Sequence, residues 1–154
     1  MVIFAFTCLL SFAGSLLTAH LIDTYLLERI SILGSFLGFE RSYNQGIAWG
    51  VQLPAQSILI LIALLLMGWY AWSTARTRMS QAGFGLILGG ALANVVDRFP
   101  DGLVTDMIQV GAFPVFNVAD SCITVGLGLL LLEIVLKEKK KKKTVNEAES
   151  LQDS

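Results

Sequence analysis

Two aspartates, Asp106 and Asp120, have a spacing that could bring two carboxyl groups together on one peptide bond. The stretch between them contains Gly111 and Pro114, so the chain can fold back there. Two carboxyls in contact do not ionise independently, so the pKa of one rises and the pair shares a proton. The ionised member can take a proton from water, while the protonated member polarises a peptide carbonyl and later protonates the leaving amine. This chemistry is that of an aspartic protease.

A metal site is the competing interpretation, because clusters of aspartates bind divalent cations. The sequence has one His, few acids and no H-E-x-x-H motif, so a zinc peptidase is disfavoured. We therefore expect neither a metal ion nor a cofactor, although the spacing of the two aspartates alone does not decide the matter.

Other acids and amides lie near the same two aspartates in the sequence. Asn94 and Asp97 stand three residues apart, as do Asn117 and Asp120, so each pair shares a helix face. Arg98 follows directly. These residues also have structural interpretations: an ion pair for Asp97 with Arg98, interhelical hydrogen bonding for Asn94, and a helix cap for Asn117. Asp23, at the outer end of the first apolar stretch, has one as well, as a cap of the outer loop.

The composition indicates what must position these side chains. Of 154 residues, 55% are apolar and 15% are charged, whereas soluble domains carry about 25% charged residues. We therefore predict an all-α membrane protein in which one domain, residues 1–136, is followed by a charged tail, residues 137–154. Four apolar stretches fit a bilayer crossing of about 20 residues. They are residues 2–22, 53–72, 82–96 and 115–136.

The basic residues predict the orientation. Arg76 and Arg78 lie between the second and third stretches, and all six Lys lie between Lys137 and Lys143. Because basic residues favour the cytoplasmic side, both termini should be cytoplasmic and residues 23–52 and 97–114 should face outward. The first outward segment is long enough for a few short strands or an interfacial helix. Nothing in the charge pattern indicates a nucleic-acid partner; membrane lipids are the expected surroundings.

This topology brings the polar residues to one depth, just below the outer surface. Asp120 is the hardest of them to explain structurally, because the apolar stretch that carries it offers no nearby cation. A small transporter or proton channel would also use intramembrane acids, but at several depths across the bilayer. A non-catalytic assembly subunit would use the spacing Gly85-x-x-x-Gly89 for close helix packing and would leave the acids unexplained.

At these residues the sequence resembles the bacterial lipoprotein signal peptidases, the type II signal peptidases of peptidase family A8. The resemblance rests on five blocks in family order between residues 21 and 126. They are Leu21-Ile-Asp23, Asn44-Gln-Gly46-Ile-Ala-Trp49, Gly89-Gly-Ala-Leu-Ala-Asn-Val-Val-Asp97-Arg98, Val104-Thr-Asp106-Met-Ile and Phe116-Asn-Val-Ala-Asp120-Ser-Cys-Ile-Thr-Val-Gly126.

The resemblance implies four membrane helices, a small outward β-rich element, and a place in the bacterial inner membrane with the active site near the outer face. We expect a monomer, with the face of Gly85 and Gly89 packed either within one chain or between chains. It implies that prolipoproteins are the partners, cut just before a diacylglyceryl-modified Cys. Carried over by position, Asp106 and Asp120 would be catalytic. The residues that would bind substrate or shape the site are Asp23, Asn44, Gly46, Asn94, Asp97, Arg98 and Asn117. The sequence departs from the family pattern at Leu27, where a Lys is common, at Trp49, where a Phe is usual, and at Gln109, where an acid is common.

Overall fold

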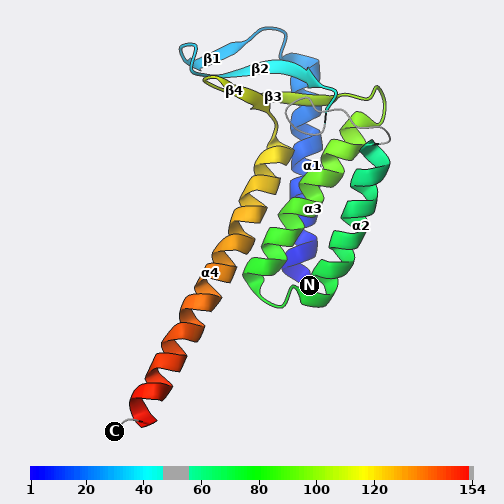
Figure 1. Ribbon diagram of the computed structural model, residues 1–154. Helices are drawn as coiled ribbons and strands as arrows, with labels where there is room; N and C mark the ends of the chain where they lie inside the picture. Colours follow the sequence, from blue (N-terminus) through cyan, green and yellow to red (C-terminus); the bar gives the residue numbers. More distant parts are fainter. Residues whose placement is uncertain (47–55, 153–154) are drawn as a thin grey trace.

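The described part of the chain forms four long helices and a four-stranded sheet that lies at one end of them (Figure 1). The structure is a computed structural model that describes residues 1–46 and 56–152. Its elements, in chain order, are α1 (Val2–Tyr25), β1 (Ile30–Leu33), β2 (Leu37–Asn44), α2 (Gln56–Thr74), α3 (Arg78–Arg98), β3 (Val104–Val110), β4 (Phe113–Phe116) and α4 (Val118–Gln152). The predicted fold class, membrane helices with a small β-rich element, is confirmed.

Three helices are long and apolar enough to cross a bilayer within the described residues: Val2–Tyr25, Arg78–Arg98 and Val118–Thr144. The apolar part of α2 is shorter there, Ile58–Thr74. The predicted start of this second span, at residue 53, lies outside the described residues.

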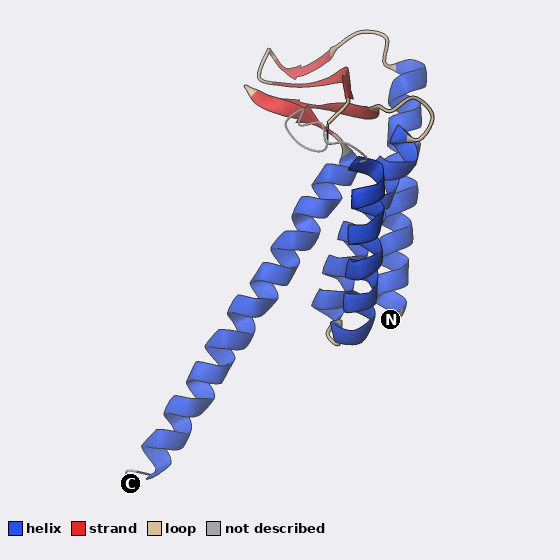
Figure 2. Ribbon diagram, turned by 45° about the vertical axis from the view of Figure 1, so that its right-hand side comes forward, coloured by secondary structure: helices blue, strands red, loops and turns tan. Residues whose placement is uncertain are grey.

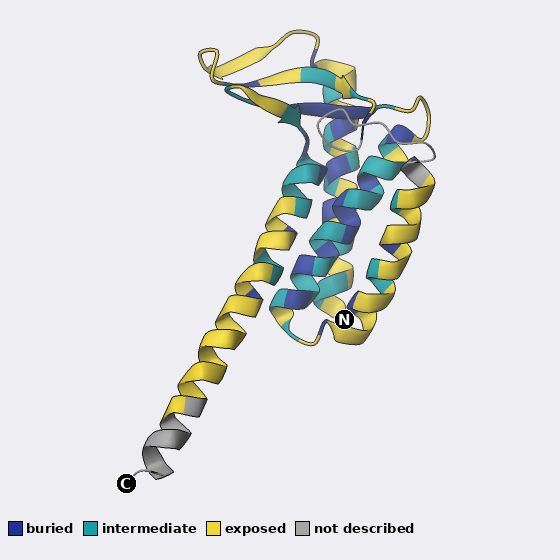
Figure 3. Cartoon of the chain, viewed as in Figure 1, coloured by how far each residue is buried: buried dark blue, intermediate teal, exposed yellow. Residues whose placement is uncertain are grey.

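Exposed positions run along the outward surfaces of the helices (Figure 3), and many of them carry large apolar side chains. Leu9 on α1 is 66% exposed, Leu65 on α2 is 68% exposed and Ile134 on α4 is 61% exposed. A water-soluble bundle would bury such side chains, whereas helices in a bilayer place them against lipid tails, which are themselves apolar. The surface therefore agrees with the membrane character that the composition predicts.

Small residues on α3 hold it tightly between α1 and α4. A Cβ atom built on Gly89 would collide with the backbone carbonyl of Cys8 on α1, and one on Gly90 would lie 2.6 Å from the Ala119 carbonyl oxygen on α4. Only glycine permits such approaches, as in other tightly packed membrane helices. The close packing predicted for Gly85-x-x-x-Gly89 thus occurs within this chain. It places Asn94, one turn beyond Gly90, beside the start of α4.

The sheet is antiparallel, with strand order β1-β2-β3-β4. It lies at the end of the bundle opposite the N-terminus, while α4 leads away from it beyond the other helices (Figure 2). Residues 115 and 116 were expected at the start of the fourth helix but belong to β4, because Phe116 pairs with Ile108 of β3. Helix α4 accordingly begins later, at Val118, and continues beyond residue 136 to Gln152.

Candidate active site

Asp106 lies in the middle of β3, and only 3% of its surface is exposed. Strand pairing places it opposite Ser42 of β2, and the ends of the helices cover the sheet at this point. Its carboxylate oxygen Oδ1 accepts a hydrogen bond of 2.9 Å from Asn117 Nδ2, and the side chain of Asn44 lines the same cavity. The Asn117 amide thus orients this buried carboxyl.

Asp120 lies in the first turn of α4, where a negative charge interacts favourably with the exposed N–H groups of the helix. Its Oδ1 accepts a hydrogen bond of 2.9 Å from Asn94 Nδ2 on α3. This contact depends on the close packing of α3 against α4 at Gly90. The carboxyl is therefore held by a neighbouring helix as well as by its own.

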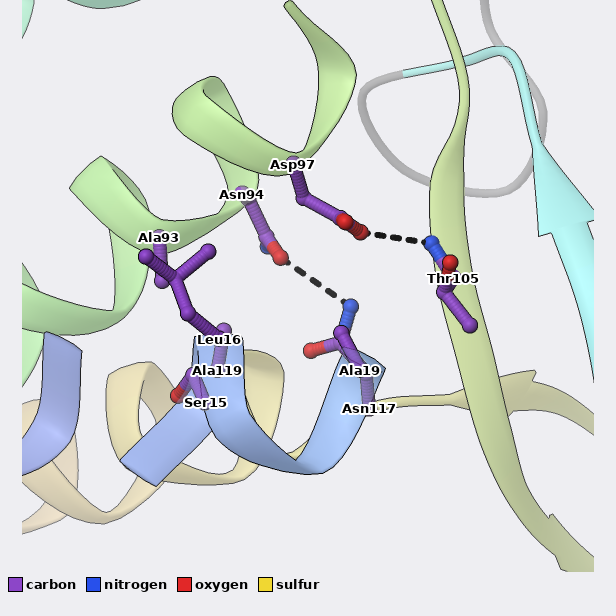
Figure 4. A pocket seen from close by; sticks show the side chains of 9 residues that line it. All are labelled: Ser15, Leu16, Ala19, Ala93, Asn94, Asp97, Thr105, Asn117 and Ala119. Atoms are coloured by element: carbon purple, nitrogen blue, oxygen red, sulfur yellow. Dashed lines mark hydrogen bonds between the residues drawn. The ribbon is translucent and has the colours of Figure 1, made fainter. Parts of the chain in front are cut away.

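Asn117 connects the two aspartates. Its Oδ1 accepts the Asp120 backbone N–H at 2.8 Å, as a helix-capping residue does. Its Nδ2 donates both to Asp106 and, at 3.0 Å, to Asn94 Oδ1 (Figure 4). The capping interpretation of Asn117 is correct, but the same amide also orients both carboxyls and the second amide, Asn94.

The two aspartates line one cavity of about 140 Å³. Its lining combines the polar cluster with apolar side chains of three helices. It consists of Asn44, Ile60, Ala91, Asn94, Val95, Arg98, Val104, Asp106, Asp120 and Ile123. An apolar pocket with a few convergent polar groups is typical of a substrate site. Residues expected from four separate segments of the sequence are thus brought together here.

The electrostatics of the cavity favour a proton on Asp106. Burial, and then the charge of Asp120, raise the pKa of Asp106 from 3.8 to about 6, against the opposing hydrogen bonds from Asn44 and Asn117. Desolvation disfavours a carboxylate, and a second carboxylate nearby disfavours it further. The pair is therefore suited to hold one proton in mildly acidic solution, up to about pH 6.

Arg98 and Asn44 both hold Gly46 beside the cavity. Arg98 is 6% exposed, and its Nη2 donates to the Gly46 carbonyl oxygen at 2.6 Å. The Gly46 backbone N–H donates to Asn44 Oδ1 at 2.8 Å. These two bonds hold the backbone at Gly46 in place. The Arg98 cation lies in the wall of the cavity. The Asn-x-Gly part of the second sequence block thus contributes to the site through its backbone.

Asp97 and Asp23 do not line the cavity and act on it through Thr105, the residue before Asp106. Asp97 Oδ2 accepts the Thr105 backbone N–H at 2.7 Å (Figure 4). Asp23 Oδ2 accepts the Thr105 hydroxyl at 3.0 Å, and its Oδ1 accepts the Tyr43 hydroxyl at 3.2 Å. The two acids therefore fix β3 from α3 and from the end of α1. The ion-pair interpretation of Asp97 with Arg98 is replaced by these separate partners.

Sequence reasoning did not select Thr105 or Tyr43 as contributors to the site. One feature of the sequence pointed to Thr105: it directly precedes Asp106. Contacts that hold Thr105 in place therefore also hold the backbone of Asp106 in place. Gln109, the departure from the family pattern, accepts a hydrogen bond of 2.6 Å from Arg29 Nη2. That bond joins the segment before β1 to β3 and lies away from the cavity.

The potential metal ligands of the site are two carboxyls supported by amides. Within residues 1–46 and 56–152, no group of three or more His, Cys, Asp or Glu side chains is arranged to hold a metal ion. The donors around Asp106 and Asp120 are amide N–H groups, which bind carboxylate oxygens and compete with a cation for them. The arrangement is better suited to orienting two carboxyls than to binding a metal.

The chain matches a known protein family over most of its length. Residues 7–136 match the model of the family described as signal peptidase (SPase) II. The lipoprotein signal peptidase of Syntrophomonas wolfei is 37% identical over 146 residues, which cover 84% of this chain and 95% of that protein. The lipoprotein signal peptidase of Chlorobium luteolum is 36% identical over 121 residues, covering 68% of this chain and 72% of that protein.

Solved structures show the same fold. A bacterial membrane enzyme determined by the in meso method at 2.3 Å resolution superposes with a TM-score of 0.73 and 27% identity, covering 88% of this chain and 89% of that one. A second, at 1.9 Å resolution, gives a TM-score of 0.74 with 27% identity, covering 84% of this chain and 90% of that one. The helices and the sheet of this chain therefore have the arrangement of a known membrane enzyme.

Proposed function

This chain belongs to the signal peptidase II family of membrane proteases, and we propose that it is an aspartic endopeptidase that removes the signal peptide of diacylglyceryl-modified prolipoproteins. The cut falls just before the lipidated Cys. Asp106 and Asp120 are the catalytic pair. The observation that carries this proposal is that both carboxyls line one cavity and are connected through Asn117.

The reaction needs one proton on the pair. Asp106 carries this proton in the reactive form of the enzyme, in agreement with its raised pKa. Asp120 takes a proton from a water molecule as the water oxygen attacks the peptide carbonyl carbon, and Asp106 donates its proton to the carbonyl oxygen. When the C–N bond breaks, the proton on Asp120 passes to the leaving amine, and a proton from the tetrahedral intermediate's hydroxyl returns to Asp106 as the carbonyl forms again. The pair then holds one proton, as it did before the reaction.

The apolar lining supports a helical, membrane-embedded substrate. Ile60 of α2, Val95 of α3 and Ile123 of α4 surround the polar cluster on the bundle side. The signal helix of a prolipoprotein would lie against these three helices, and its acyl chains would stay in lipid. Because the membrane itself orients such a substrate, binding would supply much of the positional advantage for the reaction.

The same arrangement supports an orientation with the site near the outer face. The N-terminus lies at the end of the bundle opposite the sheet, and α4 leads its Lys run away in the same direction (Figure 1). Arg76 and Arg78 lie at the connection of α2 to α3, also at that end. With basic residues on the cytoplasmic side, both termini are cytoplasmic and the sheet faces outward.

A cleavage assay tests this function directly. The purified full chain is incubated in phospholipid nanodiscs with a lipid-modified prolipoprotein, with and without a chelator, and the products are analysed by mass spectrometry. We expect a product whose first residue is the lipidated Cys, formed equally well with chelator. Unmodified prolipoprotein serves as the control substrate and should remain uncut. Loss of cleavage with chelator would indicate a metal enzyme and contradict the proposal.

A further inference from the structure

Helix α4 continues beyond the other helices, and this extension carries every Lys of the chain (Figure 1). Residues 137–143, which we call the lysine collar, consist of six Lys and one acid, Glu138. The last five Lys are consecutive, and because an α-helix has 3.6 residues per turn, their side chains point to all sides of α4. Every residue of the collar is exposed. The collar is therefore a ring of positive charge around one helix.

The collar begins where the rest of the bundle ends. Thr77, in the connection between α2 and α3, donates from its hydroxyl to Glu133 Oε1 on α4 at 2.9 Å. This turn of α4 therefore lies beside the connection, and Lys137 follows it one turn further on. From Ile134 to Thr144 every residue of α4 is exposed.

Two further observations indicate that this level is the boundary of a bilayer. The end of α2 carries Trp69 and Trp72, which are 75% and 67% exposed, and Trp is enriched where lipid tails meet headgroups. The part of α4 from Asp120 to Lys137 spans about 26 Å at about 1.5 Å per residue, and the hydrocarbon core of a bilayer is about 30 Å thick. When Asp120 lies just inside one boundary, the collar starts at the other.

The collar offers ammonium groups that the protein does not neutralise. Lys137 pairs with Glu133, and Lys142 Nζ lies 3.4 Å from Glu138 Oε1. The Lys that form no ion pair with the side chains described in the structure are Lys139, Lys140 and Lys141. These three rise about 3–6 Å beyond Lys137 along the helix, and the headgroup layer on each side of a bilayer is about 5–8 Å thick. The unpaired charges thus stand at the depth of the headgroups.

We propose that the lysine collar binds anionic phospholipids, whose headgroup phosphates pair with the ammonium groups of Lys139, Lys140 and Lys141. A cluster of Lys directly after a membrane helix has the charge and the position to attract such lipids. A zwitterionic headgroup carries a cation of its own and is held less firmly. The lipids belong to the leaflet at the end of the bundle away from the sheet, which is the cytoplasmic leaflet in the orientation proposed above. They hold α4 at one depth in the bilayer.

Electron paramagnetic resonance of spin-labelled lipids tests this binding. The purified full chain is reconstituted in phosphatidylcholine bilayers with a trace of spin-labelled phosphatidylglycerol or phosphatidylcholine, and the spectra give the ratio of the two association constants with the protein. We expect a preference for phosphatidylglycerol of about fivefold at low salt, the effect of one Lys near an anionic surface. The preference should fall toward one in about 1 M NaCl, where the screening length is about 3 Å.

Variants assign the preference to the collar. Replacing Lys139, Lys140 and Lys141 together by Gln should bring the ratio close to one, whereas replacing the same three by Arg keeps the charge and should preserve the wild-type ratio. The double variant Arg76→Gln/Arg78→Gln removes the other basic residues at this end of the bundle and should retain most of the preference. All four chains should elute alike on gel filtration, since the replaced side chains are exposed.

Three results would overturn the proposal. The first is a wild-type ratio of one at low salt, and the second is a Gln variant that keeps the wild-type ratio, most clearly if the Arg76→Gln/Arg78→Gln variant loses it. The third is wild-type protein that binds heparin in phosphatidylcholine bilayers without preferring phosphatidylglycerol, because the collar would then bind a soluble polyanion. None of these readouts depends on cleavage, so the lipid site is tested separately from the proposed function.

Discussion

Replacing Asn117 by Ala should move the alkaline limb of the pH–rate profile upward. The wild-type amide donates a hydrogen bond of 2.9 Å to Asp106 and thereby lowers the pKa of that carboxyl, which nevertheless lies at about 6. Without the amide, the ionised form of Asp106 loses a stabilising donor. The carboxyl then keeps its proton to higher pH, and the state with one shared proton persists further into the alkaline range.

The size of the shift follows from the strength of that bond. A hydrogen bond to a charged group contributes about 1.5–3 kcal/mol, and about 1.4 kcal/mol corresponds to one pKa unit. The limb should therefore move up by roughly 1 to 2 units, to about pH 7–8. The ratio of kcat/KM at about pH 7.5 to that at about pH 5.5 should rise roughly tenfold, although the activity at both pH values falls because the carboxyls are less well oriented.

A second variant separates this effect from the role of Asn117 as a helix cap. Asn117 Oδ1 accepts the Asp120 N–H, and loss of such a cap costs about 1 kcal/mol of stability. Asn117→Ser keeps a capping oxygen but has no amide to reach Asp106. It should be more stable than Asn117→Ala, and the alkaline limb of its pH–rate profile should move to higher pH by the same amount. The assay is kcat/KM against pH for lipid-modified prolipoprotein, with thermal unfolding measured in the same buffers. A limb that stays in place or moves downward in both variants would refute the reasoning.

Three further predictions follow from the same geometry. Because the pKa of Asp106 is raised to about 6, the native state binds its proton more tightly than the unfolded chain does. That contribution to stability is complete below about pH 4 and is lost as the pH rises through about 6, so the wild type should lose more thermal stability than Asp106→Asn between those values. Thr105→Val removes the hydroxyl that Asp23 accepts and should lower kcat on the order of threefold to tenfold, about one hydrogen bond; a Thr105→Ser variant that does not recover the rate would contradict this. Gly89→Leu places a side chain against the Cys8 carbonyl and should prevent α1 from packing on α3, seen as loss of the folded monodisperse protein on gel filtration, whereas Gly14→Leu, where a Cβ meets nothing within 4 Å, should fold normally.

The sequence predicted the helices and the gathering of polar residues because both depend on local pattern. Apolar length and the placement of basic residues indicate where helices lie, and the spacing of Asn94, Asp97, Asn117 and Asp120 places them on the facing sides of two neighbouring helix ends. The glycines of α3 also carried a readable signal, since small residues at this spacing permit close approach.

The parts that sequence did not predict depend on contacts between distant segments. Residues 115 and 116 are apolar and were predicted as the start of a helix, but pairing with β3 decides their conformation. The role of Thr105 likewise requires both Asp97 and Asp23, which lie far from each other in the sequence.

The central claim is that Asp106 and Asp120 perform the cleavage, and single replacements by Asn test it most directly. Each Asn keeps the shape of the side chain but cannot hold the shared proton. The measurement is single-turnover cleavage of lipid-modified prolipoprotein by purified Asp106→Asn and Asp120→Asn, each first shown to be folded and to bind the substrate. The account predicts that binding persists while cleavage falls below detection in both variants, whereas a conservative change outside the cavity, Ser11→Ala, cleaves at the wild-type rate. Cleavage at the normal rate by either aspartate variant would contradict the account.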